Sequence, residues 1–246
     1  MTNERARAVR VGTSGWHYPH WRGPFYPRDL AKPDWLAFYA QRFSSVEVNS
    51  SFYGFPSEKS VRNWLDSVPP HFRFALKASR YITHRKKLKD CAEPLARFLA
   101  WAELFGSRLG PILFQLPPRW HVNAERLARF LDLLPDGLDF AFELRDPSWH
   151  APAVFDLIAA RGAAFCQFEL AGLATPEVVT SDLVYVRLHG PDELAYRGGY
   201  ADEALAVWVR RVDRWVAEGH RVWLFFDNDD AGHAALDALR LSAQLA

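Results

Sequence analysis

Charged side chains recur near the ends of several short apolar segments of this chain, and their types suit acid–base chemistry. Three are acids and three are bases: Glu47, Glu143 and Asp227, and Lys77, Arg145 and Arg187. His189 follows another such segment. Glu143 or Glu47 would serve as a general base and His189 as a general acid, while the cations hold anionic oxygens. Three fixed cations suit a phosphate or a carboxylate group.

Regular elements must position these side chains. Short runs rich in β-branched and aromatic residues predict strands at residues 10–14, 45–49, 72–78, 111–116, 138–144, 163–167, 183–188 and 222–226. Helical periodicity follows most of them, at residues 33–43, 58–67, 93–105, 124–134, 151–160, 202–217 and 231–245. Residues 168–182 contain Gly172 and Pro176 and predict a degenerate turn in place of a helix.

This alternation predicts the α/β class and a single TIM-like (β/α)8 barrel over residues 1–246, with the helix between strands six and seven degenerate. A length of 246 residues suits one such domain, which typically uses roughly 250. A doubly wound sheet would usually carry a glycine-rich phosphate turn after its first strand. The segment Thr13-Ser14-Gly15-Trp16 lacks that spacing.

The active site of such a barrel lies at the carboxyl ends of its strands, and the two-residue period of a strand decides which side chains face the axis. Val46 and Val48 share one face, which leaves Glu47 and Asn49 on the other. The same alternation directs a further set of polar residues inward: Lys77, Gln115, Glu143, Arg145, Arg187, His189 and Asp227.

Two other interpretations of this inward set stay open. Buried ionisable groups are costly unless they are paired, so a charge-balanced set could be a structural ion-pair network that plugs the barrel. Glu143, His189 and Asp227, with Gln167 on the sixth strand, also have the ligand types of the divalent-metal sites in barrel isomerases. The neighbouring arginines oppose a bound cation, so the sequence predicts no metal and no other cofactor.

The composition argues against several classes of protein. There are 30 Lys and Arg against 29 Asp and Glu, and a net charge of +1 does not favour a general polyanion binder. Cys91 and Cys166 cannot form a disulfide framework, and no apolar run approaches the roughly 18 residues of a membrane helix. The first ten residues do not resemble a signal peptide. We therefore expect a cytoplasmic protein with no membrane partner.

Two segments at the predicted active end leave alternatives open. The aromatic loop at residues 16–26 could stack on a sugar or a base, or could be a lid packed on the barrel. The basic segment at residues 79–90 contains His84 and could be a solvated helix start or a funnel for an anion. Together they support an alternative function, the non-catalytic binding of single-stranded nucleic acid, with an affinity that falls steeply with salt.

Motifs along nearly the whole chain occur in the order of a known family. They are Gly12-Thr13-Ser14-Gly15-Trp16, Glu47-Val48-Asn49-Ser50-Ser51-Phe52-Tyr53, Phe74-Ala75-Leu76-Lys77, Gln115-Leu116-Pro117-Pro118, Glu143-Leu144-Arg145 with Ser148-Trp149, Val186-Arg187-Leu188-His189-Gly190 and Phe226-Asp227-Asn228. The sequence resembles the YecE-like family of TIM-barrel proteins (domain of unknown function 72). The resemblance implies a TIM-like barrel and no established reaction. Asp227 stands where we expect Asn in many relatives.

The sequence thus predicts an enzyme that binds a small anionic, sugar-like molecule, phosphorylated or carboxylated, for acid–base or hydrolytic chemistry. The hydrolase, lyase and isomerase classes all fit, but without a Gly-x-Ser-x-Gly motif a serine hydrolase is disfavoured. A metal-dependent phosphodiesterase is a further alternative. The predicted catalytic residues are Glu47, Glu143 and His189. The residues predicted to bind substrate are Asn49, Tyr53, Lys77, His84, Gln115, Arg145, Trp149, Arg187, Asp227 and Asn228.

Overall fold

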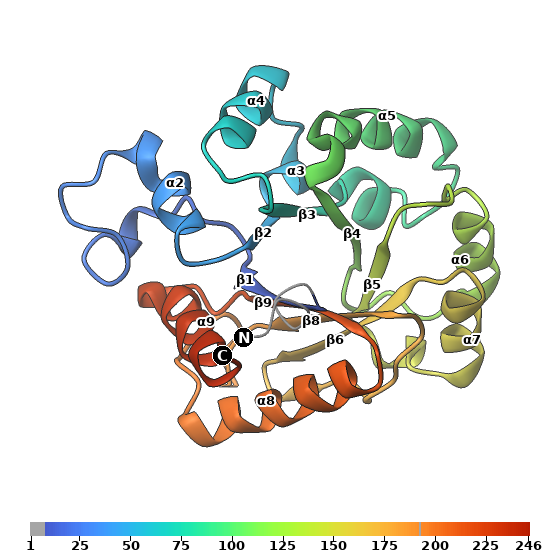
Figure 1. The fold of residues 1–246 in the computed structure, drawn as a ribbon. Helices are drawn as coiled ribbons and strands as arrows, with labels where there is room; N and C mark the ends of the chain where they lie inside the picture. Colours follow the sequence, from blue (N-terminus) through green and yellow to red (C-terminus); the bar gives the residue numbers. More distant parts are fainter. Residues whose placement is uncertain (1–7, 192) are drawn as a thin grey trace.

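Eight parallel strands form a nearly closed barrel in the computed structural model, which describes residues 8–191 and 193–246 (Figure 1). The strands are β1 (Val9–Thr13), β2 (Ser45–Val48), β3 (Arg73–Lys77), β4 (Leu109–Leu116), β5 (Phe140–Leu144), β6 (Ala164–Leu170), β8 (Leu183–Leu188) and β9 (Arg221–Phe226). Their order in the sheet is β1-β9-β8-β6-β5-β4-β3-β2, and all hydrogen-bonded neighbours on this path run parallel. The predicted TIM-like barrel is confirmed.

The barrel closes between β1 and β2 through a few specific contacts. Ser14 and Glu47 form an isolated parallel bridge, and the amide of Gly15 donates to the carbonyl of Glu47 at 2.8 Å. A Cβ at Gly12 would lie 2.4 Å from the carbonyl oxygen of Ser45, so only glycine lets the two strands approach this closely. These contacts place the ends of β1 and β2 side by side at the mouth.

Helices surround the barrel on its outside (Figure 1). The α-helices are α2 (Trp35–Ala40), α3 (Ser50–Tyr53), α4 (Glu58–Asp66), α5 (Ala92–Ala102), α6 (Ala124–Leu131), α7 (Pro152–Ala160), α8 (Asp202–Ala217) and α9 (His233–Gln244). Local sequence sets some of their starts: Ser57 and Asn123 cap α4 and α6 by accepting from the amides of Ser60 and Arg126. Among the described residues, no helix combines the length and the apolar character needed to cross a membrane.

Short 3-10 and π-helical turns complete the connections. They are η1 (Pro19–Trp21), η2 (Lys32–Asp34), η3 (Tyr81–Arg85, a π-helix), η4 (Glu103–Arg108), η5 (Pro147–Trp149) and η6 (Asp230–Gly232). Both η3 and η5 follow the carboxyl end of a strand, β3 and β5 respectively, so they lie at the mouth of the barrel.

The connection between β6 and β8 carries no helix, as the sequence predicts. The chain turns at Ala171 and Gly172, both with positive φ, into β7 (Leu173–Ala174), which pairs antiparallel with β6. The hydroxyl of Thr175 then accepts from the amide of Phe168, and that of Thr180 from the amide of Phe165. These two hydroxyls give backbone amides of β6 a hydrogen-bond acceptor within the connection that carries no helix.

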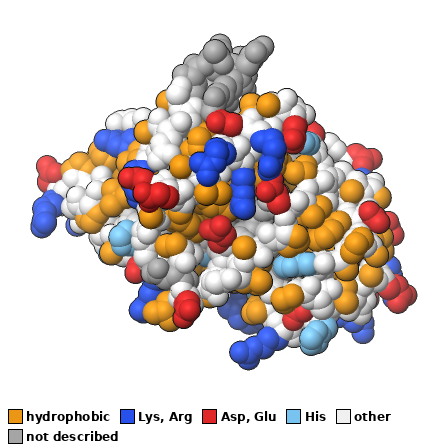
Figure 2. Space-filling model, turned by 90° about the horizontal axis from the view of Figure 1, so that it is seen from below, with side chains coloured by type: hydrophobic (Ala, Val, Ile, Leu, Met, Phe, Trp, Pro, Cys, Tyr) orange, Lys and Arg blue, Asp and Glu red, His pale blue; other side chains and the backbone are white. Residues whose placement is uncertain are grey.

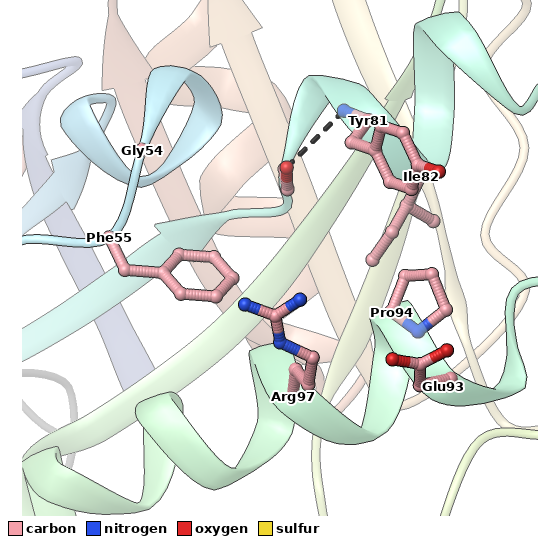
Figure 3. A pocket seen from close by; sticks show the side chains of 8 residues that line it. Gly54, Phe55, Tyr81, Ile82, Glu93, Pro94 and Arg97 are labelled. Carbon is pink, nitrogen blue, oxygen red and sulfur yellow. Dashed lines mark hydrogen bonds between the residues drawn. The ribbon is translucent and has the colours of Figure 1, made fainter.

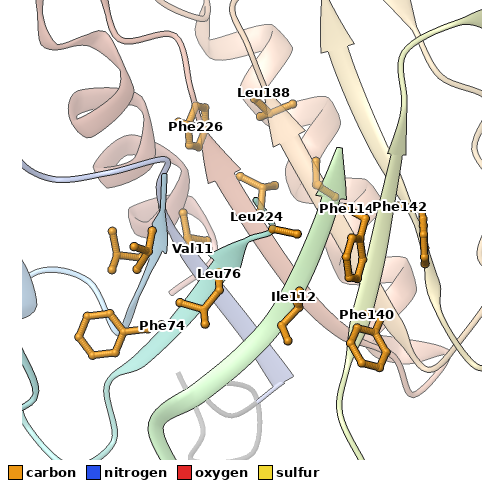
Figure 4. Packing of buried hydrophobic residues seen from close by; sticks show 14 of the residues in the cluster. Val11, Phe74, Leu76, Ile112, Phe114, Phe140, Phe142, Leu188, Leu224 and Phe226 are labelled. Atoms are coloured by element: carbon orange, nitrogen blue, oxygen red, sulfur yellow. The ribbon is translucent and has the colours of Figure 1, made fainter. Parts of the chain in front are cut away.

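The apolar core has two parts, on opposite sides of the strands. Between strands and helices lie the outward side chains labelled in Figure 4, which include Phe74, Phe114, Phe142 and Phe226. Inside the barrel a second cluster contains Ala75, Leu113, Ala141, Ala164, Cys166, Leu183, Tyr185, Trp223 and Phe225. The inward residues that come later along the strands are polar. The barrel is therefore filled with apolar side chains below and charged side chains towards the mouth.

Candidate active site

Strand register brings the predicted inward residues together at the mouth. Gln115 and Glu143 are register partners on β4 and β5, and the Gln115 Nε2 donates to the Glu143 Oε1 at 2.9 Å. On β8, Tyr185 and Arg187 share the inward face because they are two residues apart. His189 continues that phase beyond the strand. The side chains therefore come from separate strands and converge, as the alternation predicts.

The guanidinium of Arg187 lies at the centre of this cluster and is fully buried. It donates to both carboxylate oxygens of Glu47 at 3.1 and 2.8 Å, and to Glu143 at 2.7 Å. Further bonds reach Asp227 at 3.0 Å and the hydroxyl of Ser14 at 3.1 Å. All its nitrogens are thus occupied by protein groups, which leaves Arg187 without a free donor for a ligand.

The two glutamates are just as fully engaged. Besides Arg187, Glu47 accepts from the hydroxyls of Ser14 and Tyr185, each at 2.7 Å. Glu143 accepts from Gln115 and from Arg145 Nε as well as from Arg187. Burial alone would raise the pKa of Glu143, but the adjacent Arg145 and Arg187 outweigh it and hold the pKa well below its ordinary value. Glu143 is therefore a carboxylate at neutral pH.

His189 and Asp227 form a hydrogen-bonded pair beside Arg187. The Nδ1 of His189 lies 2.9 Å from the Asp227 Oδ2, and its Nε2 lies 3.5 Å from the Glu143 Oε1. The imidazole is fully buried, whereas the Asp227 side chain is 14% exposed. Burial opposes ionisation of Asp227, but Arg187 and the hydrogen bond from His189 lower its pKa to about 2. Asp227 is therefore the acid of the cluster that reaches solvent.

Lys77, His84 and Arg145 lie at the rim and are less satisfied than the groups beneath them. Arg145 donates to Glu143 and, through Nη1, to the hydroxyl of Tyr196 at 2.8 Å, but no described group accepts from its buried Nη2. Burial and the charge of Arg187 lower the pKa of Lys77 to about 8. Burial, and then the charges of Lys77 and Arg145, lower the pKa of His84 to about 4, so its imidazole is neutral.

Some predicted binding residues lie away from this cluster. Asn49 stays at its edge, where Nδ2 donates to the carbonyl of Ser14 at 3.1 Å and the buried Oδ1 has no donor. Tyr53 projects from α3 and is 74% exposed. Trp149 is fully buried, and its indole N–H donates to the carbonyl of Trp120.

Asn228 is also fully buried. Its Nδ2 donates to the carbonyl of Gly198 and to Asp237, both at 2.8 Å, which ties the loop after β8 to α9. Neither Asn228 nor Trp149 has an open face towards the mouth, because each side chain is buried among protein groups.

Three residues that sequence reasoning missed complete the cluster: Ser14, Tyr185 and Tyr196. Tyr185 shares the inward parity of Arg187, so the alternation carried a signal for it. Ser14 directly follows β1, and its hydroxyl donates to Glu47 and accepts from Arg187. Tyr196 lies on an irregular loop and packs edge-on against His189 with 5.4 Å between ring centroids. No periodic pattern could have predicted that contact.

Comparison with known proteins gives the family. A family model described as "Protein of unknown function DUF72" matches residues 10–246. The chain belongs to the DUF72 family. This confirms the resemblance read from the motifs.

Among curated proteins, this DUF72 chain is 24% identical over 259 residues to the UPF0759 protein YunF of Bacillus subtilis, covering 92% of the chain and 91% of that protein. It is 28% identical over 144 residues to the UPF0759 protein YecE of Escherichia coli K12; that match covers 58% of the chain and spans only half the length of the relative. A DUF72 family protein from Thermotoga maritima superposes with a TM-score of 0.87 at 28% identity, covering 96% and 98% of the two chains.

The geometry of the DUF72 cluster bears on the metal interpretation. Glu47, Glu143 and Asp227 surround the Arg187 guanidinium, a fixed cation. Gln167, grouped with these acids in the metal interpretation, faces away from the axis: its neighbour Cys166 fills the barrel, and the Gln167 Nε2 donates to the carbonyl of Val178 outside it. Within residues 8–191 and 193–246, no three His, Cys, Asp or Glu side chains are grouped as a metal site requires.

The aromatic loop of this DUF72 protein divides into two parts. Trp21 and Tyr26 are fully buried, and Tyr26 stacks on Trp35 with 4.9 Å between ring centroids. Trp16 and His17 instead help to line a groove of about 950 Å³ beside the mouth. The groove is lined by Gly15, Trp16, His17, Tyr18, Lys32, Pro33, Asp34, Leu36, Asn49, Ser50, Asn63, Trp64, Asp66 and Ser67.

The basic segment does not act as a single patch. Lys86 donates to the carbonyl of Asp90 at 3.0 Å, and Lys87 lies over the ring of Trp120. His84 is the residue of this segment whose pKa is lowered by the mouth cations Lys77 and Arg145. On the face shown in Figure 2, Lys and Arg side chains are interspersed with Asp and Glu. The binding of a nucleic-acid backbone through one concentrated charge is therefore not favoured on that face.

A smaller cavity of about 320 Å³ lies outside the barrel, between the turn that follows β3 and helix α5 (Figure 3). Its lining includes Phe55, Ile82 and Pro94, with Arg97 extending towards Phe55. None of the residues predicted from the sequence lines it. Tyr81 and Ile82 of its lining belong to η3, whereas Glu93, Pro94 and Arg97 belong to α5 on the outside of the barrel.

Proposed function

We propose that this DUF72 protein is an enzyme that binds a small anionic, sugar-like molecule at the barrel mouth and catalyses proton transfer on it. One observation carries the proposal: the buried Nη2 of Arg145 has no acceptor among the residues that the structure describes. A buried donor without a partner costs free energy, which an anionic oxygen of a ligand would recover. The adjacent Lys77 adds a positive charge. The reducing cytoplasm is the compartment we propose, which suits free Cys91 and Cys166.

The roles within the cluster follow from which atoms are free. The oxygens of Glu47 and Glu143 already accept hydrogen bonds, so we assign these residues to positioning Arg187 and Arg145 and not to proton abstraction. His84 is neutral, and its Nδ1 lies 2.9 Å from the hydroxyl of Thr83. Its Nε2 is therefore the better candidate for proton transfer, because a general base needs an unoccupied lone pair near the ligand.

The groove beside the mouth suits the sugar-like part of the ligand. It joins aromatic rings with amide and hydroxyl groups, a mixture that suits a polyhydroxylated molecule. Its lining includes Asn49, whose Oδ1 is a buried acceptor without a donor. Asn49 directly follows β2, the strand that pairs with the one carrying Lys77. A ligand hydroxyl at Asn49 would therefore stand next to the anion subsite.

Binding should be measured by thermal shift with glucose 6-phosphate, ribose 5-phosphate and glucuronate, and with glucose and ribose as uncharged controls. A ligand at one hundred times its Kd adds about 2.7 kcal/mol to the free energy of unfolding. We expect at least one anion to stabilise the protein and Arg145→Gln to lose the effect. Arg97→Gln, an exposed change in the outer cavity, should keep it. If no anion stabilises the wild-type protein, the proposal is wrong.

The affinity for the anion should also depend on pH in a defined direction. The pKa of Lys77 is about 8, so its positive charge is present below that pH and is lost as the pH rises through it. Affinity should therefore weaken between pH 7 and pH 9. In Lys77→Arg the charge persists over this range, because arginine stays protonated, and the weakening should disappear. An identical pH profile in the two proteins would remove Lys77 from the anion subsite.

A further inference from the structure

Lys77 differs from the other two cations of the cluster. Arg187 and Arg145 both donate to carboxylates, whereas the ammonium of Lys77 makes no hydrogen bond and no ion pair with any described residue. Its Nζ lies over the ring of Phe52, 4.5 Å from the ring centroid. The amine is thus free to meet a ligand at the end of β3, where barrel enzymes place reacting groups.

The surroundings of Lys77 favour its neutral, nucleophilic amine form. Its surroundings disfavour the ammonium form, through burial first and the charge of Arg187 second, against the weaker opposing effects of Asp227, Glu143 and Glu47. With a pKa of about 8, the Lys77 side chain is a neutral amine in about a tenth of the molecules at pH 7. An ordinary lysine has roughly one neutral amine in several thousand at that pH.

We propose that Lys77 forms an imine with the carbonyl carbon of an aldehyde- or ketone-bearing anionic substrate. The nitrogen lone pair forms the C–N bond while the carbonyl π pair moves to oxygen, which takes a proton. The resulting carbinolamine loses this hydroxyl as water after a second proton transfer, and an iminium remains. The inference rests on the proposed function, because the same mouth holds the anionic part of the substrate.

The neighbours of Lys77 fit this sequence of steps. His84 packs on the same Phe52 ring, with 5.0 Å between ring centroids. Its imidazole is neutral, so it adds no positive charge beside the amine. A neutral imidazole can both accept the proton released by nitrogen and return one to the leaving hydroxyl. The iminium carries the same single positive charge as the ammonium form of Lys77, opposite Asp227 and Glu143.

Reductive trapping tests the inference directly. The full-length protein is incubated at pH 7 with glyceraldehyde 3-phosphate, dihydroxyacetone phosphate or pyruvate and sodium cyanoborohydride, and the adducts are mapped by peptide mass spectrometry. We expect one of these probes to modify Lys77 at least tenfold faster than the exposed Lys59 and Lys89. Lys77→Arg keeps the charge but cannot form an imine, so it should bind the same anion without a trapped adduct at this position.

The outcomes separate the two proposals. If an anionic probe stabilises the protein but Lys77 reacts no faster than Lys59, the imine is refuted and anion binding stands. If uncharged glyceraldehyde modifies Lys77 as fast as its phosphate does, the lysine is a nucleophile and the anion subsite is refuted. If no probe stabilises the protein and Lys77 is not modified, both proposals fail.

Discussion

Replacing the buried Arg187 by methionine should destabilise the protein strongly and make its stability depend on pH in a new way. Glu47, Glu143 and Asp227 all contact this guanidinium. Removing one partner of a buried ion pair typically costs about 3–5 kcal/mol, because a buried charge is left uncompensated. The buried charge of Glu47 should be left the least compensated, since Arg187 is its one cationic partner among the described side chains, whereas Glu143 keeps Arg145.

The sign of the pH effect follows from the protons bound. In the wild type the pKa values of Glu143 and Asp227 are lowered, so their contribution to stability is present at neutral pH and is lost only in strong acid. In Arg187→Met, burial still raises the pKa of Asp227 while the cation that most lowers it is gone, so the pKa would rise above its unfolded value and the folded state would bind an extra proton. The free energy of unfolding should then fall as pH rises, by up to about 1.4 kcal/mol per unit per proton.

The assay is urea unfolding followed by tryptophan fluorescence at pH 5 and pH 8, with Arg221→Met as the matched control. Arg221 also contacts two carboxylates, Asp139 at 2.7 Å and Asp182 at 3.0 Å, but its side chain is 41% exposed. Exposed pairs contribute about 0–1 kcal/mol, so the control should lose little at either pH. Equal losses in the two variants, or a loss in Arg187→Met that is the same at pH 5 and pH 8, would refute the reasoning.

Two further substitutions test the contact that closes the barrel between β1 and β2 and the hydrogen bond from Tyr185 to Glu47. Gly12→Ala places a methyl group against the Ser45 carbonyl and should cost about 1–3 kcal/mol of stability, measured as a lowered Tm. A methyl group at Gly54 would have no heavy atom within 4 Å, so Gly54→Ala should not lower the Tm. Equal Tm values for the two variants would contradict the closure contact. Tyr185→Phe removes a hydrogen bond to the buried Glu47 carboxylate and should cost about 1.5–3 kcal/mol in urea unfolding; a loss indistinguishable from zero would mean that the carboxylate does not depend on this hydroxyl.

Much of the site was accessible to sequence reasoning because the strand period is short and regular. Alternation alone placed Glu47, Lys77 and Arg187 on the inward face, and the parallel order of strands brought their ends to one mouth. The lack of a helix after β6 is likewise predictable from nearby residues, because Gly172 and Pro176 do not support a helix. Such features depend on residues a few positions apart, so no knowledge of the remaining chain is needed.

Strand alternation in the sequence specifies a barrel with balanced charges in its mouth, whereas the pairing of those charges depends on the folded arrangement. Arg187 takes all three acids because it stands at the centre, and among residues 8–191 and 193–246 no carboxylate pairs with Lys77. Trp149 is buried in the core, and the hydroxyl of Tyr196, on an irregular loop, accepts a hydrogen bond from Arg145. Pairing and burial depend on contacts between distant segments, which a local period does not encode.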